Sequence, residues 1–314
     1  MNQDAFIRWA KNRGYRLAFA DTAMLGTIQE TLERRREGGE FDPAFFEENL
    51  DIFKFPQKRG VRVASPVLVA AFPAPAHILT FAVQGASVET VLPPTYVRYR
   101  PLFEQVKNEI RDEVLGGKGV IETLEVPLKS LAVVSGLAVY GRNNITYIPE
   151  FGSYHQLAGY VLDIPVEAEV HPAALERMLD LCRSCTACLK ACPTGAISKD
   201  RFLLHAERCY TLHSESLRPF PEGMNPPSPE CLIGCMKCQL VCPANKGRLK
   251  RIPAPVSFSA EETAALVAEG EIGGAPLNEG IGAKFKILGV SESIPIFRRN
   301  LRRLLKLRSP AEKR

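Results

Sequence analysis

A cysteine pattern, C-x2-C-x2-C-x3-C-P, places the strongest constraint on this 314-residue chain. The first set is Cys182, Cys185, Cys188 and Cys192, and a partial repeat contains Cys235, Cys238 and Cys242. This spacing is typical of proteins that hold two 4Fe-4S clusters, because three closely spaced thiolates wrap one cubane and the fourth points to its neighbour. The sequence therefore predicts a segment that transfers electrons one at a time.

The spacing also predicts which cysteines share a cluster. Because the last cysteine of each motif crosses over, the first cluster is predicted on Cys182, Cys185, Cys188 and Cys242. The second is predicted on Cys192, Cys235, Cys238 and one further cysteine, since Leu232 stands where the repeat would place it. Cys209 and Cys231 are both candidates. Cys209 is favoured, because Cys231 precedes Cys235 by four residues and would need a wider loop.

Zinc also binds four thiolates from C-x2-C pairs. A zinc ribbon, however, has no use for a third cysteine at this spacing or for Pro193 and Pro243 after the last cysteines. All nine cysteines lie between positions 182 and 242, which indicates metal sites in a reducing compartment and no disulfide framework. Since the first residues show no signal peptide, the protein is predicted to be cytoplasmic.

Charge and hydropathy argue against two classes of partner. The most apolar stretch, 66–86, contains Pro73, Pro75 and His77, so it is predicted as strand, turn and strand and not as a membrane span. The net charge of +5 arises from residues 298–314, which hold eight basic residues and one acid. The remaining body is nearly neutral and offers no electrostatic footprint for gripping long nucleic acid.

Helices and strands are expected to alternate over the first 170 residues. Helices are predicted over 4–14, 27–36, 96–115 and 126–135, and strands over 67–72, 78–83, 88–92, 145–148 and 156–164. This alternation predicts an α/β layered domain and leaves the strand order open.

Three domains are predicted along the chain: 1–170, an α/β cofactor and substrate domain; 171–250, the double-cluster domain; and 251–314, a helical extension that packs on the core. A helix over 173–181 should lead into the cluster segment. After it, Ser259 and Glu262 form the capping box of another helix, a glycine-rich connector follows, and 298–308 form an amphipathic helix with a basic face.

The cysteine segment resembles that of the epoxyqueuosine reductases, cousins of the reductive dehalogenases. The resemblance is carried by the first cysteine motif with its following Pro-Thr-Gly-Ala, by Cys209-Tyr-Thr-Leu, and by Ile233-Gly-Cys-Met-Lys-Cys-Gln-Leu-Val-Cys-Pro-Ala-Asn. A looser similarity covers 127–144, where the family has the form A-G-L-G-W-I-G-K-N, and continues through Phe151-Gly-Ser to Asp163.

This resemblance implies a nitroreductase-like, cobalamin-binding domain (α/β or α+β) followed by a ferredoxin-like domain with two 4Fe-4S clusters. Cobalamin would lie base-off between the two domains. The resemblance implies cofactor-binding roles for Gly136, Gly141, Arg142, Asn143 and His155, and it assigns Cys209 to a cluster. The expected partner is a low-potential electron donor such as ferredoxin or flavodoxin. The basic C-terminal helix could contact tRNA or an acidic ferredoxin, but a helix with one apolar stripe most often packs on its own domain.

The chain also departs from the family. Where the family has G-R-D-Y-H, with an aspartate as proton donor, this chain reads Tyr96-Val-Arg-Tyr-Arg-Pro, and Pro101 replaces the aspartate. Tyr99 is the alternative proton donor, as implied by the dehalogenase branch. Ala138 replaces the middle glycine between Gly136 and Gly141. Two functions follow: a corrinoid-dependent reductase whose substrate need not be the tRNA nucleoside, or an electron-transfer or corrinoid-reducing partner protein without substrate chemistry.

Overall fold

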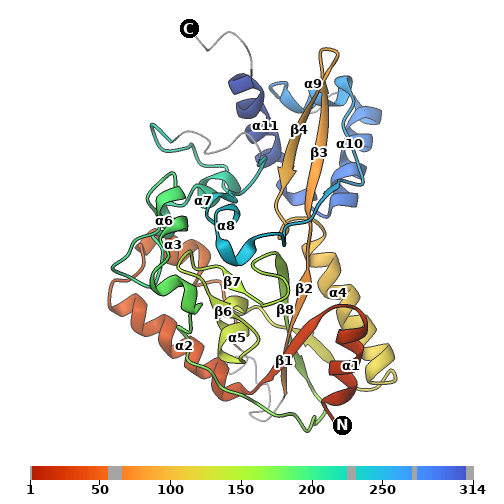
Figure 1. The fold of residues 1–314 in the computed structure, drawn as a ribbon. Coiled ribbons are helices and arrows are strands. Elements are labelled where there is room, and N and C mark those ends of the chain that lie inside the picture. Colours follow the sequence, from red (N-terminus) through yellow and green to blue (C-terminus); the bar gives the residue numbers. More distant parts are fainter. Residues whose placement is uncertain (1, 56–65, 225–230, 271–273, 309–314) are drawn as a thin grey trace.

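The computed structural model describes residues 2–55, 66–224, 231–270 and 274–308. Its larger lobe contains a four-stranded antiparallel sheet with the order β1-β2-β8-β5 (Figure 1). The strands are β1 (Arg16–Ala20), β2 (Val67–Pro73), β8 (His155–Leu162) and β5 (Ile121–Thr123). Every residue of β8 is buried, because helices cover both faces of the sheet.

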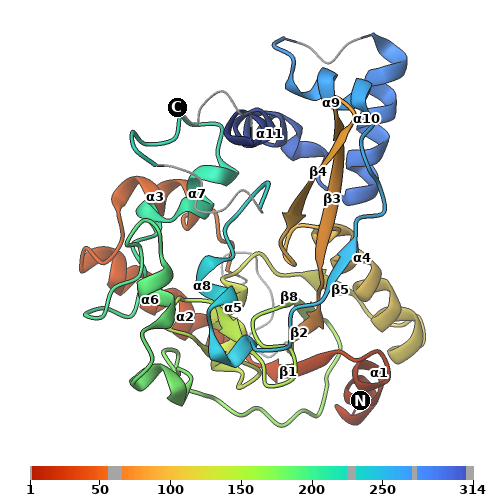
Figure 2. The same cartoon turned by 45° about the horizontal axis from the view of Figure 1, so that its top comes forward.

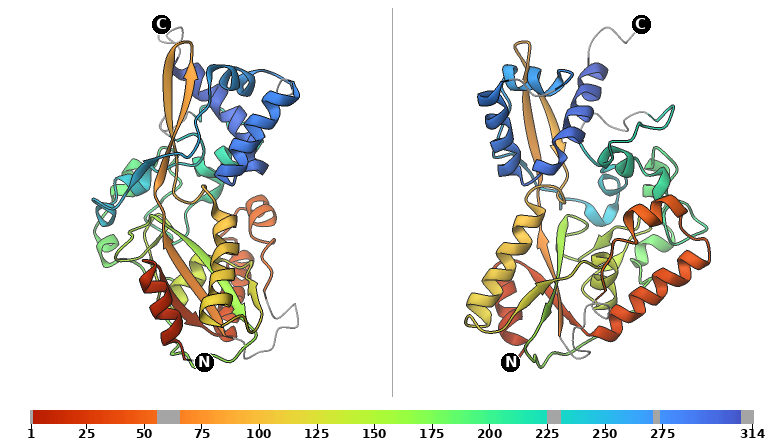
Figure 3. Two further views of the ribbon diagram at one scale, coloured as in Figure 1. Left: turned by 90° about the vertical axis from the view of Figure 1, so that its right-hand side faces the viewer. Right: turned by 180° about the vertical axis from the view of Figure 1, so that it is seen from behind.

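Two apolar cores enclose this sheet, one on each face (Figure 3). One face is covered by α1 (Asp4–Asn12), α4 (Tyr99–Glu109) and the π-helical continuation of α4, η2 (Ile110–Val114). The other face is covered by α2 (Thr22–Glu37) and α5 (Leu128–Val134). Helix α3 (Pro43–Asn49) follows α2 in the chain. Along β2, Leu68 and Phe72 join the first core, and Val67 and Val69 join the second. This is the two-residue period of a strand.

A β-hairpin leaves this sheet and forms the centre of a second lobe. Its strands are β3 (Ala76–Val83) and β4 (Ala86–Leu92), and Gln84 and Gly85 between them both have positive φ, as a type I′ turn requires. Strand β9 (Arg251–Pro253) joins β3 in parallel, and α9 (Ala260–Val267), α10 (Ala275–Leu288) and α11 (Ile294–Arg308) pack around the hairpin (Figure 2). Residues 76–92 and 251–308 therefore share one core.

The cysteine segment consists of short helical turns joined by loops. They are η3 (Asp180–Arg183), α6 (Ala187–Ala191), η4 (Ala206–Arg208), α7 (Tyr210–Glu215), α8 (Lys237–Leu240) and η5 (Pro243–Asn245). Helix α6 packs against α8, and α7 contacts α11 of the second lobe. A small ribbon of the larger lobe, β6 (Val139–Tyr140) and β7 (Thr146–Tyr147), completes the fold.

The prediction of a mixed helical and stranded fold is confirmed. Strand, turn and strand occupy the apolar stretch at 66–86, and the Ser259–Glu262 capping box begins α9. Within the described ranges, no helix has both the length and the apolar character that crossing a membrane requires.

The helix predicted over 173–181 is wrong. Met178 instead forms a β-bridge with Tyr140, and the Leu179 N–H donates a hydrogen bond of 2.9 Å to the Tyr140 carbonyl oxygen. Leu175, which lies in a turn, and Met178 are partly buried against the core below α5. A turn and a single β-bridge bring these two apolar side chains to the core, although their spacing also fits a helix.

The glycine-rich connector predicted after Gly270 is wrong over 275–288, which form α10. Ile281, Phe285 and Leu288 lie on one face of this helix and are fully buried in the second lobe. Their burial outweighs the low helix propensity of glycine. Gly289 has a φ of 73° and ends the helix, as glycine commonly does.

Candidate iron–sulfur and cofactor site

The folded chain brings eight cysteines into two adjacent groups. The first group, whose thiols influence one another electrostatically, is Cys182, Cys185, Cys188 and Cys242. The second is Cys192, Cys209, Cys235 and Cys238. Cys238 of the second group also interacts electrostatically with Cys188 of the first, so the two groups are neighbours. The grouping coincides with the two predicted ligand sets, and ligation itself stays a prediction.

Cys231 has a different setting. It forms a β-bridge with Val91 at the end of the hairpin and packs beside Tyr154 and Met236. It also lies near the second group, because Tyr96 interacts electrostatically with both Cys231 and Cys209, and Tyr210 with both Cys235 and Cys231. Cys231 is thus bridged to the hairpin, whereas Cys209 directly precedes α7 and interacts with Cys192 of the second group.

A zinc ion and a cubane hold their thiolates at different separations. Among the residues that the structure describes, no three Cys, His, Asp or Glu side chains are close enough to hold one metal ion. Four thiolates on one zinc ion lie about 3.8 Å apart, given a Zn–S bond of about 2.3 Å. In a cubane each thiolate binds a different iron, so the four sulfur atoms are held farther apart.

Burial disfavours the thiolate form in both groups. Desolvation raises the pKa of Cys235 to about 11 and raises that of Cys238 further. Backbone N–H groups act in the opposite direction, such as that of Lys237 at Cys235. Metal binding at these cysteines must therefore displace protons.

The loop from Gly141 to Asn144 contacts both cysteine groups. The Arg142 N–H donates to Cys182 Sγ at 3.4 Å, and the Arg142 guanidinium donates to the Cys182 carbonyl oxygen. The Asn143 side chain bonds to Cys238 and donates to Tyr147 Oη at 3.1 Å, and Tyr147 bonds to Cys242. The loop thus supplies donors to sulfur, which is how proteins orient and tune clusters.

Arg142 has one donor without a partner. Its Nε is buried and forms no hydrogen bond with any residue in the described part of the chain. The guanidinium is anchored at Cys182, so this donor lies beside the first cysteine group. A cluster bound there, with its negatively charged sulfides, is the kind of acceptor that this N–H lacks.

The two glycines of the predicted cofactor set have local structural roles. A Cβ on Gly141 would lie 2.5 Å from the Tyr147 ring and 2.6 Å from Asn143 Oδ1, so only glycine fits there. Gly136 ends α5 with a φ of 77°. Ala138 is buried in the core below α5. The cofactor-binding role of Gly136 and Gly141 stays a prediction.

His155 is buried with both ring nitrogens engaged. Nδ1 lies 3.2 Å from the Gly152 carbonyl oxygen and Nε2 lies 3.1 Å from Thr146 Oγ1. Desolvation lowers its pKa to about 4. The neutral ring therefore links β8 to the 146–152 loop, and its predicted cofactor role stays untested.

Tyr99, the predicted proton donor, begins α4. Its hydroxyl points to the Leu157 carbonyl oxygen at 3.4 Å, and its ring packs on Phe103. Burial raises its pKa to about 12, so it keeps its proton at neutral pH. Pro101 lies in the same first turn of α4 and is exposed.

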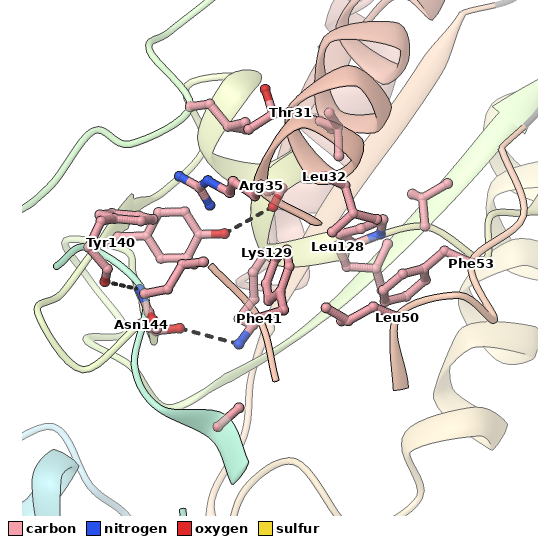
Figure 4. Close-up of a pocket in the computed structure, with 18 of the residues that line it drawn as sticks. Thr31, Leu32, Arg35, Phe41, Leu50, Phe53, Leu128, Lys129, Tyr140 and Asn144 are labelled. Atoms are coloured by element: carbon pink, nitrogen blue, oxygen red, sulfur yellow. Dashed lines mark hydrogen bonds between the residues drawn. The ribbon is translucent and has the colours of Figure 1, made fainter. Parts of the chain in front are cut away.

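Tyr99 also lines a cavity of about 400 Å³ beside the cysteine segment. Its walls come from α2, the segment 41–53, the start of α5 and the loop 202–206. Figure 4 shows apolar side chains at one end, including Leu50, Phe53 and Leu128, and polar side chains at the other, including Arg35 and Asn144. The cavity is thus apolar with one polar end, as small-molecule sites usually are.

The polar end contains a buried cation. Arg35 pairs with Glu176 and lies 5.1 Å from the centroid of the Phe202 ring, and its Nε has no hydrogen-bond partner among the described residues. Nearby, Ser130 and Tyr140 share a hydrogen bond of 3.1 Å. The sequence did not single out Arg35, because it stands in a run of three arginines typical of a solvated helix face.

Lys129 connects this cavity to the second cysteine group. It lines the cavity, donates to the Asn144 carbonyl oxygen at 3.2 Å, and feels the charges of Cys209 and Glu215. Glu215 accepts a hydrogen bond from the Tyr96 hydroxyl. Water reaches Lys129 and Glu215, yet desolvation lowers the pKa of Lys129 and raises that of Glu215. Both side chains therefore lie in a recess of the molecule.

Comparison with known proteins agrees with the cysteine arrangement. Residues 181–245 match the 4Fe-4S double cluster binding domain. The curated epoxyqueuosine reductase of Bacillus subtilis is 34% identical over 138 residues, which is 44% of this chain and 34% of that protein. That of Leadbetterella byssophila is 30% identical over 145 residues, covering 46% and 45%. The matched region thus spans less than half the length of these curated relatives.

The fold comparison reaches farther. An epoxyqueuosine reductase solved with an epoxyqueuosine-modified tRNA stem loop has a TM-score of 0.72 at 21% identity, covering 96% of this chain and 80% of that one. The Bacillus subtilis enzyme, solved with its catalytic aspartate loop swung out of the active site, has a TM-score of 0.69 with the same identity and coverage. In its fold the chain therefore resembles the epoxyqueuosine reductases, and its cysteine segment matches a domain that binds two 4Fe-4S clusters.

Proposed function

We propose that this chain is a reductase that carries two 4Fe-4S clusters and passes their electrons, through a bound corrinoid, to a substrate. The observation that supports this most is the convergence of eight cysteines into two adjacent groups of four. Two neighbouring cubanes form a relay for single electrons. We assign the first cluster to Cys182, Cys185, Cys188 and Cys242, and the second to Cys192, Cys209, Cys235 and Cys238.

The cavity beside Lys129 suits part of a corrinoid. About 400 Å³ is within the range of small-ligand pockets but too small for the entire cofactor, so we assign it to the detached lower base, which is flat and largely apolar. Phe53 and Leu128 provide apolar walls, and the Arg35 guanidinium, which is paired with Glu40 and Glu176, provides a cation at the polar end. When bound, the corrinoid supplies a centre that takes up single electrons and delivers two.

The chain's own residues would bind and protonate the substrate. A two-electron reduction also consumes two protons. Pro101 cannot supply one, so we assign one to the Tyr99 hydroxyl, which burial keeps protonated at neutral pH. Lys129, Glu215 and Tyr96 provide polar contacts in the recess next to it. Replacing Tyr99 by Phe should lower turnover and leave cofactor content unchanged, and an unchanged rate would remove Tyr99 from this role.

Metal analysis of anaerobically purified protein tests the clusters. We expect about eight irons per chain and the broad brown absorption of two cubanes. Cys209→Ser should lose the second cluster, whereas Cys231→Ser, the matched control, should keep both. Zinc in place of iron would contradict the proposal, and loss of iron only in Cys231→Ser would exchange the ligand assignment.

Titration with a corrinoid tests the second half of the proposal. Hydroxocobalamin should bind and change its absorption spectrum on entering the protein. Leu128→Trp fills the cavity and should weaken this binding while iron content stays the same. A protein with intact clusters that binds no corrinoid would favour the alternative function, in which the chain delivers electrons to a partner enzyme or to a partner's corrinoid.

Location and RNA binding complete the proposal. We place the protein in the cytoplasm, because nine cysteines between positions 182 and 242, most of them at metal-ligand spacing, suit a reducing compartment. A tRNA-borne nucleoside is one candidate substrate, by analogy with the solved relative that holds a tRNA stem loop. The arginines of α11 do not support RNA binding, since Arg298, Arg299 and Arg302 donate to backbone carbonyl groups of the protein itself.

A further inference from the structure

The surface over the first cysteine group has an apolar centre. Leu181, Leu240 and Val241 are exposed by 41%, 39% and 43% of their surface. Leu181 and Val241 directly precede Cys182 and Cys242, which belong to the same group. Because Cys182 and Cys242 belong to one group and α6 packs against α8 (Figure 1), the segments that carry these side chains, η3 and the end of α8, are neighbours.

Basic residues are close in sequence to these apolar side chains. Arg183 in η3, Lys190 in α6 and Lys246 directly after η5 are all exposed. Between Cys231 and Ala260 the sequence has five basic residues and no acid. In the loop at 180–190, Asp180 is the single acid, and it lies 3.3 Å from Arg183. The segments 180–190 and 231–260 therefore hold seven basic residues and one acid, although the chain outside its C-terminal tail is almost neutral.

This composition is that of a transient electron-transfer interface. A small apolar patch allows close approach, and a charged rim accelerates the encounter with an oppositely charged partner. The patch lies over the first cysteine group, whereas the second group adjoins Lys129 and the cavity. The two groups thus have different neighbours, one at the protein surface and one at the interior recess.

We propose that Leu181, Leu240 and Val241, with the rim of Arg183, Lys190 and Lys246, dock a small acidic protein that carries one electron at low potential. This basic docking face rests on the proposed function, because it needs a cluster on the first cysteine group. Each encounter oxidises the reduced carrier by one electron and reduces the first cluster by one, with no proton transferred. The electron then passes to the second cluster next to the recess.

Stopped-flow reduction of the cluster-loaded protein tests this docking face. The probe is a reduced, strongly acidic 2Fe-2S ferredoxin, followed by bleaching of the cubane absorption. Lys190→Glu with Lys246→Glu should lower the bimolecular rate about tenfold or more at low ionic strength and weaken its salt dependence. Val241→Glu should lower the rate by introducing a charge at the apolar centre. Lys286→Glu, on the exposed side of α10, is the matched control and should leave the rate unchanged.

A small photoreduced deazaflavin separates docking from the proposed function. It should reduce the clusters of all variants equally, because it needs no docking face. Equal ferredoxin rates in all variants would overturn the docking face while leaving the clusters intact. If Val241→Glu instead converts a dimer into a monomer in sedimentation, a second copy of the chain covers this face and the proposal is wrong. If the clusters accept electrons normally but the protein fails to bind hydroxocobalamin, only the proposed reductase is contradicted and the docking face stands.

Discussion

At the scale of single residues, Arg142 shows how the larger lobe influences the cysteine segment. Its backbone N–H and its guanidinium both contact Cys182. Its buried Nε forms no hydrogen bond with any of the described residues. Hydrogen bonds to cluster or cysteine sulfur stabilise the reduced, more negative cluster, so they raise its reduction potential. Arg142 is therefore expected to tune the first cluster selectively.

Replacing Arg142 by Lys keeps the positive charge but removes Nε. The midpoint potential of the first cluster should become more negative, and that of the second should stay the same. A redox titration followed by electron paramagnetic resonance measures both. Arg183→Lys is the control, because that side chain is 84% exposed. Equal shifts in both clusters, or none in Arg142→Lys, would show that Nε does not donate to the first cluster.

His155 gives the fold a pH dependence. Its pKa is lowered to about 4 by desolvation, whereas the unfolded chain has an ordinary histidine pKa of about 6.5. The unfolded state thus binds more protons below pH 6.5, so the stabilisation present above that pH is lost as the pH falls towards 4. At pH 5.5 the free energy of unfolding should be smaller than at pH 7.5 by roughly 1.4 kcal/mol from this group. Anaerobic urea titrations at the two pH values measure the difference, and His155→Gln should abolish this part of it. If the free energy of unfolding changes equally with pH in both proteins, His155 is excluded as the source.

At the scale of elements, α10 shows burial overriding propensity. Gly280 and Gly282 lie in its interior, and a Cβ at Gly280 would meet no atom within 4 Å. Gly289 has the opposite setting, because a Cβ there would lie 2.9 Å from Arg98 Cα and its φ is positive. A larger residue is therefore expected to stabilise α10 at Gly280, whereas position 289 requires glycine.

Replacing Gly280 by Ala should raise the free energy of unfolding by roughly 0.5–1 kcal/mol, because alanine reduces the freedom of the unfolded chain. Gly289→Ala should lower it, since the start of α4 blocks the added carbon. Thermal unfolding of the two variants beside the parent protein is sufficient. A stabilised Gly289→Ala would mean that α4 and α10 do not pack as described.

Spacing along the chain predicted the elements that depend on local pattern. The cysteine groups, the capping box at Ser259 and the strands at 66–86 follow from motifs or alternation within a few residues. The path of 173–181 did not, because its pairing partner, Tyr140, is remote in sequence. The cavity was also beyond prediction. Arg35 and Lys129, which lie on its wall, come from two predicted helices, 27–36 and 126–135, whose relative placement the sequence left open.

At the scale of the whole molecule, the second lobe and the cysteine segment share a core. Leu232 and Ile233 of the cysteine segment pack in the same core as Phe285 and Leu79. Arg299 and Asn300 of α11 donate to carbonyl groups of α7, which follows Cys209. The second lobe therefore supports the cysteine segment and is expected to unfold together with it.

Replacing Phe285 by Ala should destabilise the protein by about 3–5 kcal/mol, because this side chain is 1% exposed and packs against Phe258 and Phe297. Cluster bleaching and the loss of helix should still coincide in a denaturant titration, at a lower concentration. Ile287→Ala is the control, since Ile287 is 51% exposed. If helix is lost well before the clusters bleach, the two regions unfold separately.

The β3–β4 hairpin has a consequence for biosynthesis. The ribosome makes its apolar strands early, but the helices that cover them, α9 to α11, come more than 160 residues later. At 5–20 residues per second, the nascent hairpin stays uncovered for roughly 10 to 40 s. Chaperones have that interval in which to shield it, and the second lobe can close only after translation has passed α11.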